Sequence, residues 1–522
     1  MESHDLHRLL HKYWGYSEFR PKQEAIVQAI LGRRDAAVVM PTGGGKSLCY
    51  QLPAVAMQRT CVVVSPLIAL MQDQAASMRE IGIEAAFLNS TLDPASQREI
   101  KQRAARGELH LLYISPERIV REDMLAWLRT LPIGFFAIDE AHCISEWGHE
   151  FRPEYRQLGV LRERLPETPI AAFTASATRV VRHDILAQLN LRDPARFVMS
   201  FHRPNLRYIV RECGAEEQDR LLDAALDEYL DNGDGNLILY APTIRGTEEV
   251  ASRLAARGVA VVPYHGKMSN ELRQKNQEQW MSGEARVLVG TVAFGLGINK
   301  PDVRAVVHLS LPKSLEQYYQ EAGRAGRDGQ PADCVLLWQK RDVGLLTHFV
   351  QQIQDSAERE RAWQRYHVMR RFVEQPRCRH RQICLHFGET PKWETCGACD
   401  RCGVTLDWMQ AERQAAAAAA ARPHAGDSAV RRRLARAETR AAGEAAPVNE
   451  KLRAALKEWR RDSAKTQSVP AYVILHDTTL EALCRMQPRN AAELLAVPGI
   501  GERKAERFGS RVLEIVAEFA DA

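Results

Sequence analysis

Apolar residues along this chain fall into short continuous runs that are separated by polar or helical segments. The first set of runs lies at residues 60–65, 109–115, 133–139 and 170–175. Runs of this length without alternating polar positions are typical of strands buried on both faces, and strands separated by helices form parallel sheets. We therefore predict an α/β fold with ligand sites at the carboxyl ends of its strands.

The same alternation returns further along the chain. The second set of apolar runs lies at residues 236–241, 259–264, 286–290, 305–309 and 334–338. Residues 404–448 are dominated by Ala and Arg, with seven consecutive alanines from Ala415 to Ala421, and helical periodicity resumes at Asn449. This pattern predicts a second parallel sheet, a partly helical linker too short to build its own core, and a small helical unit.

Composition limits the class of protein. A chain of 522 residues is too long for one core, and 45% hydrophobic with 26% charged residues is typical of a soluble protein. The net charge of +5 is mild, so a nucleic-acid surface must come from local clustering. Residues 1–14 lack the apolar core of a signal peptide, and no stretch is apolar enough to span a membrane.

The clearest chemical signal is the segment 36–47, an apolar strand that leads directly into Met-Pro-Thr-Gly-Gly-Gly-Lys-Ser. Glycines in such a turn adopt positive φ and point backbone N–H groups at a phosphate, while Lys46 reaches the terminal phosphates and Ser47 can hold Mg²⁺. Met40 replaces the glycine of the strict motif, as in helicases and related translocases. The predicted nucleotide-binding loop comprises Thr42, Gly43, Gly44, Gly45, Lys46 and Ser47.

Residues 13–23 place aromatic and amide groups upstream of this loop. The Gln23 amide can both donate to and accept from an adenine edge, and Tyr16 can stack on the ring. A hydrophobic staple followed by a helix start is the alternative interpretation.

An acidic pair ends the apolar run 133–139. We predict that Asp139 holds Mg²⁺ through its water shell and that Glu140 orients and deprotonates the attacking water. A simple helix cap is the alternative, but Asp-Glu-Ala-His about ninety residues after Gly-Lys-Ser favours catalysis. Residues 174–178, Thr-Ala-Ser-Ala-Thr, are suited to relay a change at the phosphates to a neighbouring surface.

No phosphate loop accompanies the second set of runs, so we expect the second sheet to close over the first. Its candidate contribution is the segment 320–328, where Arg324 and Arg327 stand three apart among glycines. Arginines so placed can face a γ-phosphate across a cleft and stabilise charge in the transition state. A solvated helix face is the alternative.

Taken in order, these motifs resemble the RecQ family of DNA helicases over about residues 6–403. The similar segments are Phe-Arg-Pro-x-Gln, the phosphate loop, Ser-Pro-Leu-Ile-Ala-Leu-Met-Gln-Asp-Gln, Asp-Glu-Ala-His, Phe-Thr-Ala-Ser-Ala-Thr and Ala-Phe-Gly-Leu-Gly-Ile-Asn-Lys-Pro-Asp-Val-Arg. The resemblance implies adenine recognition by Tyr16, Arg20 and Gln23, and Arg327 as arginine finger with Arg324 beside it. It also implies ATP-driven 3′ to 5′ translocation on single-stranded DNA and unwinding of duplex or branched DNA in recombination and repair.

The segment 143–155 resembles the aromatic-rich loop of that family and interleaves aromatic with polar residues. Its candidate DNA contacts are Trp147, His149, Phe151, Arg152 and Tyr155. Stacking on a base within a few residues of Glu140 is the functional interpretation, and a small core under a loop is the alternative. Strand-end residues suited to contact the DNA backbone are Ser65, Pro66, Ser115 and Thr291.

Five of the 11 cysteines fall between residues 378 and 402, which indicates one metal site in a reduced cytosolic chain. Cys396, Cys399 and Cys402 follow a Cys-x-x-Cys-x-x-Cys pattern, and Cys378 lies 18 residues upstream. Four thiolates form a closed tetrahedral site for structural zinc. Cys384 and His386 are rival fourth ligands, and the family pattern favours Cys378.

The helical unit 449–522 resembles the family's HRDC module. Its Val-Pro-Gly-Ile-Gly turn, residues 497–501, can present backbone amides to a phosphate, with Arg503, Lys504, Arg507 and Arg511 beside it. A helix-packing turn with a solvated basic face is the alternative. The short linker puts the family's duplex-binding wing in doubt.

These inferences predict two RecA-like parallel-sheet lobes, a zinc-binding helical module and a small all-α C-terminal domain. The expected divisions are 1–200 and 201–340 for the lobes, 341–405 for the zinc module, 406–448 for the linker and 449–522 for the C-terminal domain. We expect a DNA-stimulated ATPase that uses ATP, Mg²⁺ and Zn²⁺ and acts on single-stranded and branched DNA. We further expect a monomer of the bacterial cytoplasm or nucleoid, with a single-strand-binding protein as a candidate partner. Alternatives are an RNA helicase, a single-strand translocase with weak unwinding, and a DNA-binding scaffold without turnover.

Overall fold

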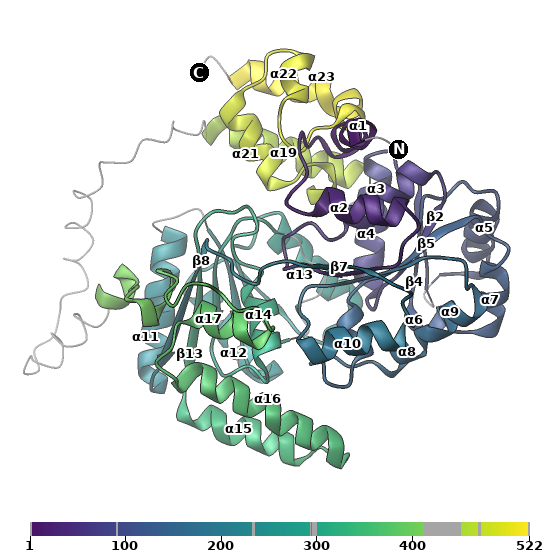
Figure 1. Ribbon diagram of the computed structural model, residues 1–522. Coiled ribbons are helices and arrows are strands. Elements are labelled where there is room, and N and C mark those ends of the chain that lie inside the picture. Colours follow the sequence, from purple (N-terminus) through teal and green to yellow (C-terminus); the bar gives the residue numbers. More distant parts are fainter. Residues whose placement is uncertain are drawn as a thin grey trace, which may run out of the picture.

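The computed structural model describes residues 3–89, 92–231, 235–292, 294, 300–411, 450–467 and 471–519. Two α/β lobes lie side by side, with one helical module on the second lobe and another across both lobes (Figure 1). The two parallel sheets predicted from the apolar runs are confirmed.

The first lobe holds a seven-stranded sheet in the order β3-β4-β2-β5-β6-β1-β7, in which every pair is parallel. Its strands are β1 Ala36–Val39, β2 Thr60–Val64, β3 Ala85–Leu88, β4 Leu111–Ile114, β5 Ile133–Ile138, β6 Ile170–Thr174 and β7 Ala195–Val198. Its helices are α1 Ser3–Trp14, α2 Gln23–Leu31, α3 Leu48–Met57, α4 Ile68–Glu80, α5 Pro94–Ala105, α6 Pro116–Ile119, α7 Glu122–Leu128, η1 Ala141–Ile144, α8 Pro153–Arg156, η2 Gln157–Gly159, α9 Val160–Arg164 and α10 Arg179–Gln188.

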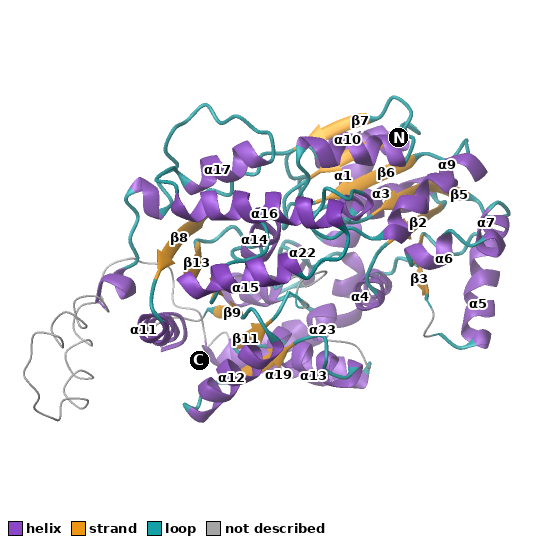
Figure 2. Ribbon diagram, turned by 90° about the horizontal axis from the view of Figure 1, so that it is seen from below, coloured by secondary structure: helices purple, strands orange, loops and turns teal. Residues whose placement is uncertain are grey.

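Helices cover both faces of this sheet, which explains its continuous apolar strands (Figure 2). In β2, Cys61 and Val63 pack in one hydrophobic cluster, while Val62 and Val64 pack in the cluster on the opposite face. Successive side chains of a strand point to opposite faces, so a polar residue at any of these positions would be buried.

The second lobe holds a six-stranded parallel sheet in the order β10-β11-β9-β12-β13-β8. Its strands are β8 Leu206–Glu212, β9 Asn236–Tyr240, β10 Val261–Tyr264, β11 Val287–Gly290, β12 Val303–His308 and β13 Ala332–Trp338. Its helices are α11 Ala215–Leu226, η3 Asp227–Asp231, α12 Ile244–Ala256, α13 Asn270–Met281 and α14 Leu315–Ala322.

Three strands escaped the sequence analysis, namely β3, β7 and β8, and each lies at a sheet edge. Strand β7 alternates half-buried and exposed residues, and β8 carries Arg207 and Arg211 among its apolar residues. Edge strands need not be apolar on both faces, so the continuous-run signal is weak there.

The helical module on the second lobe contains α15 Lys340–Gln351, α16 Ser356–Glu374, α17 Arg379–His386 and η4 Asp400–Cys402. The C-terminal module contains α19 Glu450–Thr466, α20 Ala471–Ile474, α21 Asp477–Met486, α22 Ala491–Leu495 and α23 Glu502–Phe519. Helix α23 packs against α1, and α20 packs against α4 and α13, so this module contacts both lobes. Most of the predicted linker 406–448 lies outside the described residues. Among the helices that the structure describes, none is both long and apolar enough to cross a membrane.

Candidate functional site

The phosphate loop joins β1 to α3, as predicted. Gly43 and Gly45 both adopt φ of +83°, a conformation that L side chains rarely adopt. A Cβ atom on Gly45 would clash with Gln23 Nε2. The glycine at position 45 is therefore required both by the backbone conformation and by the close approach of Gln23.

Gln23 and Arg20 hold this loop from the start of α2. The Gln23 amide donates to the carbonyls of Gly44 and Gly45 at 3.1 and 3.3 Å and accepts from Arg20 N at 2.9 Å. The Arg20 guanidinium donates to the carbonyl of Gly43. Tyr16 is largely exposed. In this structure Gln23 contacts the loop itself, and adenine recognition by these residues stays a prediction.

The predicted acidic pair lies at the carboxyl end of β5, directly beneath the loop. Glu140 adopts the left-handed conformation with φ 46°, a strained geometry that is concentrated at functional sites. Its Oε1 lies 3.3 Å from Lys46 Nζ. Burial alone would raise the pKa of Glu140, but Lys46 and His142 outweigh it and lower that pKa, so the carboxylate is ionised at neutral pH.

The pKa of Asp139 is shifted in the opposite direction from that of Glu140. Burial, followed by the negative charge of Glu140, raises the pKa of Asp139 to about 6. Two buried carboxylates side by side repel each other, and a divalent cation would relieve that repulsion. The predicted magnesium ligand Ser47 is oriented by Gln74, whose Nε2 donates to Ser47 Oγ at 3.2 Å.

A chain of polar contacts leads from this pair to the second lobe. His142 Nδ1 lies 3.3 Å from Glu140 Oε2 and 3.0 Å from Thr174 Oγ1. In the same strand-end segment, Ser176 Oγ accepts from Gln320 Nε2 of α14 at 2.8 Å. Residues 174–178 therefore contact both the acidic motif and the other lobe, and their role as a relay stays a prediction.

Arg324 and Arg327 both follow α14, and Arg327 lies against the phosphate loop. A Cβ atom on Gly43 would lie 3.4 Å from Arg327 Cγ, so Arg327 lies directly against the loop. Arg324 Nε donates to Tyr240 Oη at 2.9 Å. Burial, then the charges of Arg324 and Arg203, lower the pKa of Arg327, which means that its positive charge is destabilised where it stands. An anion such as a phosphate would relieve this destabilisation.

A cavity of about 620 Å³ lies between the phosphate loop and the turn 323–328 that follows α14, here called the arginine turn. This volume is within the range of small-molecule and cofactor sites. Its lining includes residues from both lobes, among them Arg20, Thr42, Gly43, Gly44, Arg203 and Arg327. The geometry thus assembles a nucleotide-sized site at the boundary of the two lobes.

The aromatic loop begins directly after the acidic motif. Trp147 is 50% exposed, and the His149 ring stacks on His142 at a centroid distance of 4.9 Å. Arg152 Nη1 donates to the carbonyl of Pro66 at 3.2 Å, while Phe151 is partly buried. The loop therefore carries an exposed indole, whose ring lies 5.9 Å from the Arg361 guanidinium, and an imidazole that stacks on the His142 of the acidic motif.

Tyr155 corrects the predicted set of DNA contacts. It is 0% exposed, and its hydroxyl donates to the carbonyl of Asp139 at 3.0 Å. Pro153 begins the short helix α8, which turns Tyr155 toward the core. Tyr155 therefore holds the end of β5 and is not placed to stack on a base. Of the strand-end residues expected to contact the DNA backbone, Ser65 and Pro66 are also buried, whereas Ser115 and Thr291 are partly exposed.

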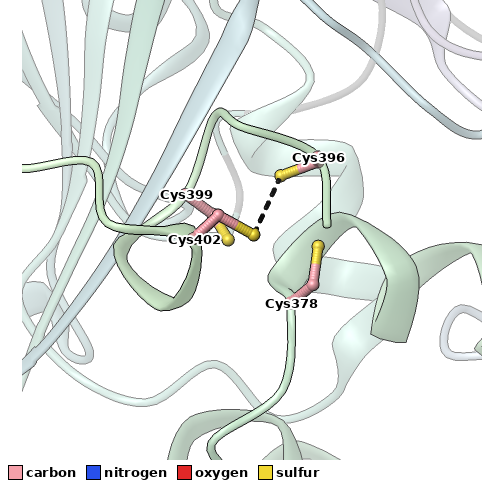
Figure 3. Close-up of side chains that lie close together, drawn as sticks. All are labelled: Cys378, Cys396, Cys399 and Cys402. Carbon is pink, nitrogen blue, oxygen red and sulfur yellow. Dashed lines mark hydrogen bonds between the residues drawn. The ribbon is translucent and has the colours of Figure 1, made fainter. Parts of the chain in front are cut away.

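The four predicted cysteines converge in the module on the second lobe (Figure 3). The Sγ atoms of Cys378, Cys396, Cys399 and Cys402 all lie within 4.8 Å of one another. Zn–S bonds of about 2.3 Å would place tetrahedral ligands about 3.8 Å apart, so the set fits zinc. Backbone N–H groups of Arg379 and Ala398 point at two of the sulfurs, at 3.4 and 3.3 Å.

The rival ligands have other partners. His386 Nε2 lies 2.6 Å from Glu316 Oε1, and Cys384 is buried away from the four-sulfur group. The structure therefore agrees with Cys378 as the fourth ligand.

Replacing Cys399 with serine is expected to lower the zinc content and the soluble yield, because formation of such a site is coupled to local folding. Zinc stoichiometry of the purified full chain measures the effect. Cys384→Ser is the matched control and should retain wild-type zinc, because Cys384 lies outside the four-sulfur group. Unchanged stoichiometry in Cys399→Ser would disprove the ligand set.

The turn at residues 497–501 lies against the first lobe. A Cβ atom on Gly501 would lie 2.6 Å from the carbonyl oxygen of Lys12, and Arg507 Nη1 pairs with Glu80 Oε2 at 2.6 Å. Lys504 is 8% exposed, and Lys300 Nζ of the second lobe lies 3.4 Å from Asp477 Oδ2. In this arrangement the turn packs helices together, which was the alternative to phosphate binding.

Two positioning side chains were missed by the sequence analysis. Gln74 accepts from the hydroxyls of Tyr50 and Tyr113 while it donates to Ser47. Its place in the Met-Gln-Asp-Gln segment was the available signal. Arg203 lies between the two sheets and carried no signal in the pattern of residues.

Family models match four consecutive parts of the chain. They are described as DEAD/DEAH box helicase over residues 20–183, helicase conserved C-terminal domain over 219–329, RecQ zinc-binding over 340–403 and HRDC domain over 449–516. The zinc-binding model covers all four cysteines, and the first model covers the phosphate loop and the acidic pair.

Solved structures agree with the two-lobed fold. The helicase MrfA bound to DNA superposes with a TM-score of 0.54 at 18% identity, over 65% of this chain and 52% of that one. Mss116p bound to single-stranded RNA and AMP-PNP superposes with a TM-score of 0.53 at 17% identity, over 66% and 76%. These likenesses support the fold alone.

Sequence relatives cover almost the whole chain. The ATP-dependent DNA helicase RecQ of Pasteurella multocida is 32% identical over 98% of this chain and 93% of its own length. The protein of the same name from Bacillus subtilis is 32% identical over 99% of both chains. With the helicase motifs, the four-cysteine module and the HRDC domain in this order, the chain belongs to the RecQ family of ATP-dependent DNA helicases.

Proposed function

We propose that this helicase moves 3′ to 5′ along single-stranded DNA and unwinds duplex or branched DNA in recombination and repair. The observation that carries the proposal is the aromatic loop, which joins an exposed indole to the catalytic carboxylate within one short segment. A base stacked on Trp147 would lie two residues along the chain from His149, whose ring stacks on His142, and His142 lies 3.3 Å from Glu140. DNA contact and ATP hydrolysis would thereby be coupled.

Residues of the first lobe would bind ATP and its metal ion. Lys46 and the loop amides would hold the phosphates, and Tyr16, Arg20 and Gln23 would recognise the adenine. Ser47 and Asp139 would hold Mg²⁺, which neutralises charge on the phosphates when bound. The buried carboxylate pair fits such a cation, as the raised pKa of Asp139 indicates.

Hydrolysis itself would depend on Glu140 and Arg327. Glu140 would orient a water molecule and accept its proton, while Arg327 would stabilise charge on the γ-phosphate in the transition state. Both side chains are in place only when the two lobes are together, because Glu140 follows β5 of the first lobe and Arg327 follows α14 of the second.

Unwinding of tailed duplexes by the purified full chain tests the polarity. A duplex with a 3′ single-stranded tail should be unwound in the presence of ATP, whereas one with a 5′ tail should not. Equal unwinding of both, or unwinding of the 5′-tailed duplex alone, would disprove the proposed direction. Stimulation of the ATPase by RNA but not by DNA would favour the RNA helicase.

A single-strand translocase with weak unwinding is the second candidate. The alignment with the P. multocida helicase runs over 594 positions, more than the 522 residues of this chain, so that relative carries residues without counterparts here. DNA-stimulated ATPase together with slow or absent unwinding of both tailed duplexes would favour this candidate.

We further propose that the protein acts as a monomer in the bacterial cytoplasm or nucleoid and that a single-strand-binding protein is a partner.

Replacing Trp147 with alanine is expected to leave basal ATPase largely intact and to abolish its stimulation by single-stranded DNA. The reason is that base stacking contributes about 1–3 kcal/mol per base, and that Trp147 contacts Arg361 of α16 and is not part of the phosphate loop, residues 42–47. ATPase rates with and without oligonucleotide measure the effect.

The matched control is Trp127→Ala. Trp127 belongs to α7 of the same lobe and packs against its core. This control should keep its stimulation in the folded protein, because α7 does not contribute to the aromatic loop. Stimulation that survives in Trp147→Ala would show that the loop is a packing element and not a DNA contact.

A further inference from the structure

Arg203 connects the two halves of the nucleotide site. It lies between β7 and β8, in the segment that links the lobes. Its Nη1 donates to the carbonyls of Thr42 and Gly323 at 3.2 and 3.4 Å, and its Nη2 donates to those of Ala325 and Gly326 at 3.1 and 2.9 Å. One guanidinium therefore binds the phosphate loop of the first lobe and the arginine turn of the second.

The turn is shaped to receive these bonds. Asn205 Nδ2 donates to the carbonyls of Gly326 and Gln330 at 2.8 and 2.9 Å. Gly326 adopts φ of +54°, and a Cβ atom on it would lie 2.5 Å from Asn205 Nδ2. The glycine and the asparagine thus present the turn carbonyls to Arg203, immediately before Arg327.

Arginine suits this position for a physical reason. A guanidinium offers five N–H donors in a planar fork, whereas a lysine offers a single charged centre. Four carbonyls from two lobes can be bridged by the fork but not by one ammonium group. Because its Nη donors are already directed at backbone carbonyls, Arg203 differs from Arg327, whose position against Gly43 suits contact with a phosphate.

The zinc module holds the backbone of Arg203. His380 of α17 places Nε2 3.1 Å from the carbonyl oxygen of Arg203 and Nδ1 3.1 Å from Cys396 Sγ. The His380 ring is 1% exposed, and the rings of His202 and Tyr208 pack edge-on against it, each at 4.8 Å. A single imidazole therefore lies between a predicted zinc ligand and the residue that ties the lobes together.

We propose that Arg203 is a positioning residue for ATP hydrolysis and that His380 couples it to the zinc module. Arg203 sets the distance between the phosphate loop and the arginine turn, and thereby the place of Arg327 at the γ-phosphate. Misplacement of a catalytic group by about 1 Å can cost about 10² in rate. The inference rests on the proposed ATP hydrolysis and adds the device that aligns the two lobes for it.

The first test compares Arg203→Lys with wild type in the full chain. We expect kcat for DNA-stimulated ATP hydrolysis to fall about tenfold or more, while the Kd for a non-hydrolysable ATP analogue stays within about threefold, because misplacement affects the transition state more than ground-state binding. A wild-type kcat, or a Kd that weakens as much as kcat falls, would overturn the positioning role.

Arg207→Lys is the matched control. Arg207 lies on β8, four residues further on, and its guanidinium binds Asp333 through Nε at 2.6 Å and Nη2 at 2.9 Å. Arg207→Lys therefore removes the same planar guanidinium, but outside the nucleotide site. Its kcat should stay near the wild-type value. A comparable fall of kcat in both variants would overturn the proposal. Absence of ATPase in the wild-type chain would instead overturn the proposed function.

The second test replaces His380 with phenylalanine, which keeps a buried ring but removes both hydrogen bonds. Zinc stoichiometry should stay at the wild-type value, since His380 is outside the four-sulfur group. We expect kcat to fall, and the double variant with Arg203→Lys to be no slower than Arg203→Lys alone, because coupled residues are not additive. Lost zinc, an unchanged kcat or additive effects would each overturn the coupling through His380.

Discussion

Replacing Arg327 with lysine is expected to lower kcat for ATP hydrolysis by about 10³-fold, the lower end of the range for an arginine finger. Lysine keeps the positive charge but lacks the planar fork that can bind two phosphate oxygens at once. The Kd for a non-hydrolysable ATP analogue should change little, because this interaction is made mainly in the transition state. Single-turnover hydrolysis and analogue binding separate the two effects.

Arg324→Lys is the matched comparison. Arg324 lies in the same turn, but its Nε is directed to Tyr240, at 2.9 Å, and it is 6% exposed. We expect a smaller loss of kcat than for Arg327→Lys. If Arg324→Lys lowered kcat more than Arg327→Lys does, Arg324 would be the arginine finger. The contact of Arg327 with Gly43 would then be a packing contact.

Local motifs made the chemistry of this chain predictable. The phosphate loop, Asp139 with Glu140, and the three clustered cysteines are each formed by neighbours in sequence, so their spacing alone carries the geometry. The apolar runs likewise located strands that are buried on both faces. These features depend little on the rest of the fold.

Contacts between distant segments were the part that sequence could not supply. Arg203 meets Thr42 and Gly323 across separations of 161 and 120 residues, and no local pattern marks it. The polar neighbours of Tyr155 in the sequence predict an exposed aromatic side chain. In the structure, helix α8 turns this side chain into the core. The basic turn of the C-terminal module likewise has the residues of a phosphate site but packs on α1.

Glu140→Gln is the second variant for which a large effect is expected. Glutamine keeps the size and one acceptor oxygen of the glutamate side chain, but it cannot accept a proton as a carboxylate does. Turnover should fall by about 10² or more, the scale of general-base catalysis, while the Kd for ATP stays close to wild type. The matched control is Glu150→Gln, a second carboxylate near His142, at 3.6 Å, which should keep most of the basal rate.

The ion pair between Lys46 and Glu140 explains why the carboxylate can serve this role. Lys46, at 3.3 Å, helps to hold the pKa of Glu140 low, and a carboxylate of low pKa is a weak base. When phosphate oxygens compete for Lys46, that stabilisation weakens and the pKa of Glu140 rises toward the useful range. Nucleotide binding would then activate the base. If Glu140→Gln turned over ATP at near the wild-type rate, Glu140 would be a partner of Lys46 only, and the water would be activated elsewhere.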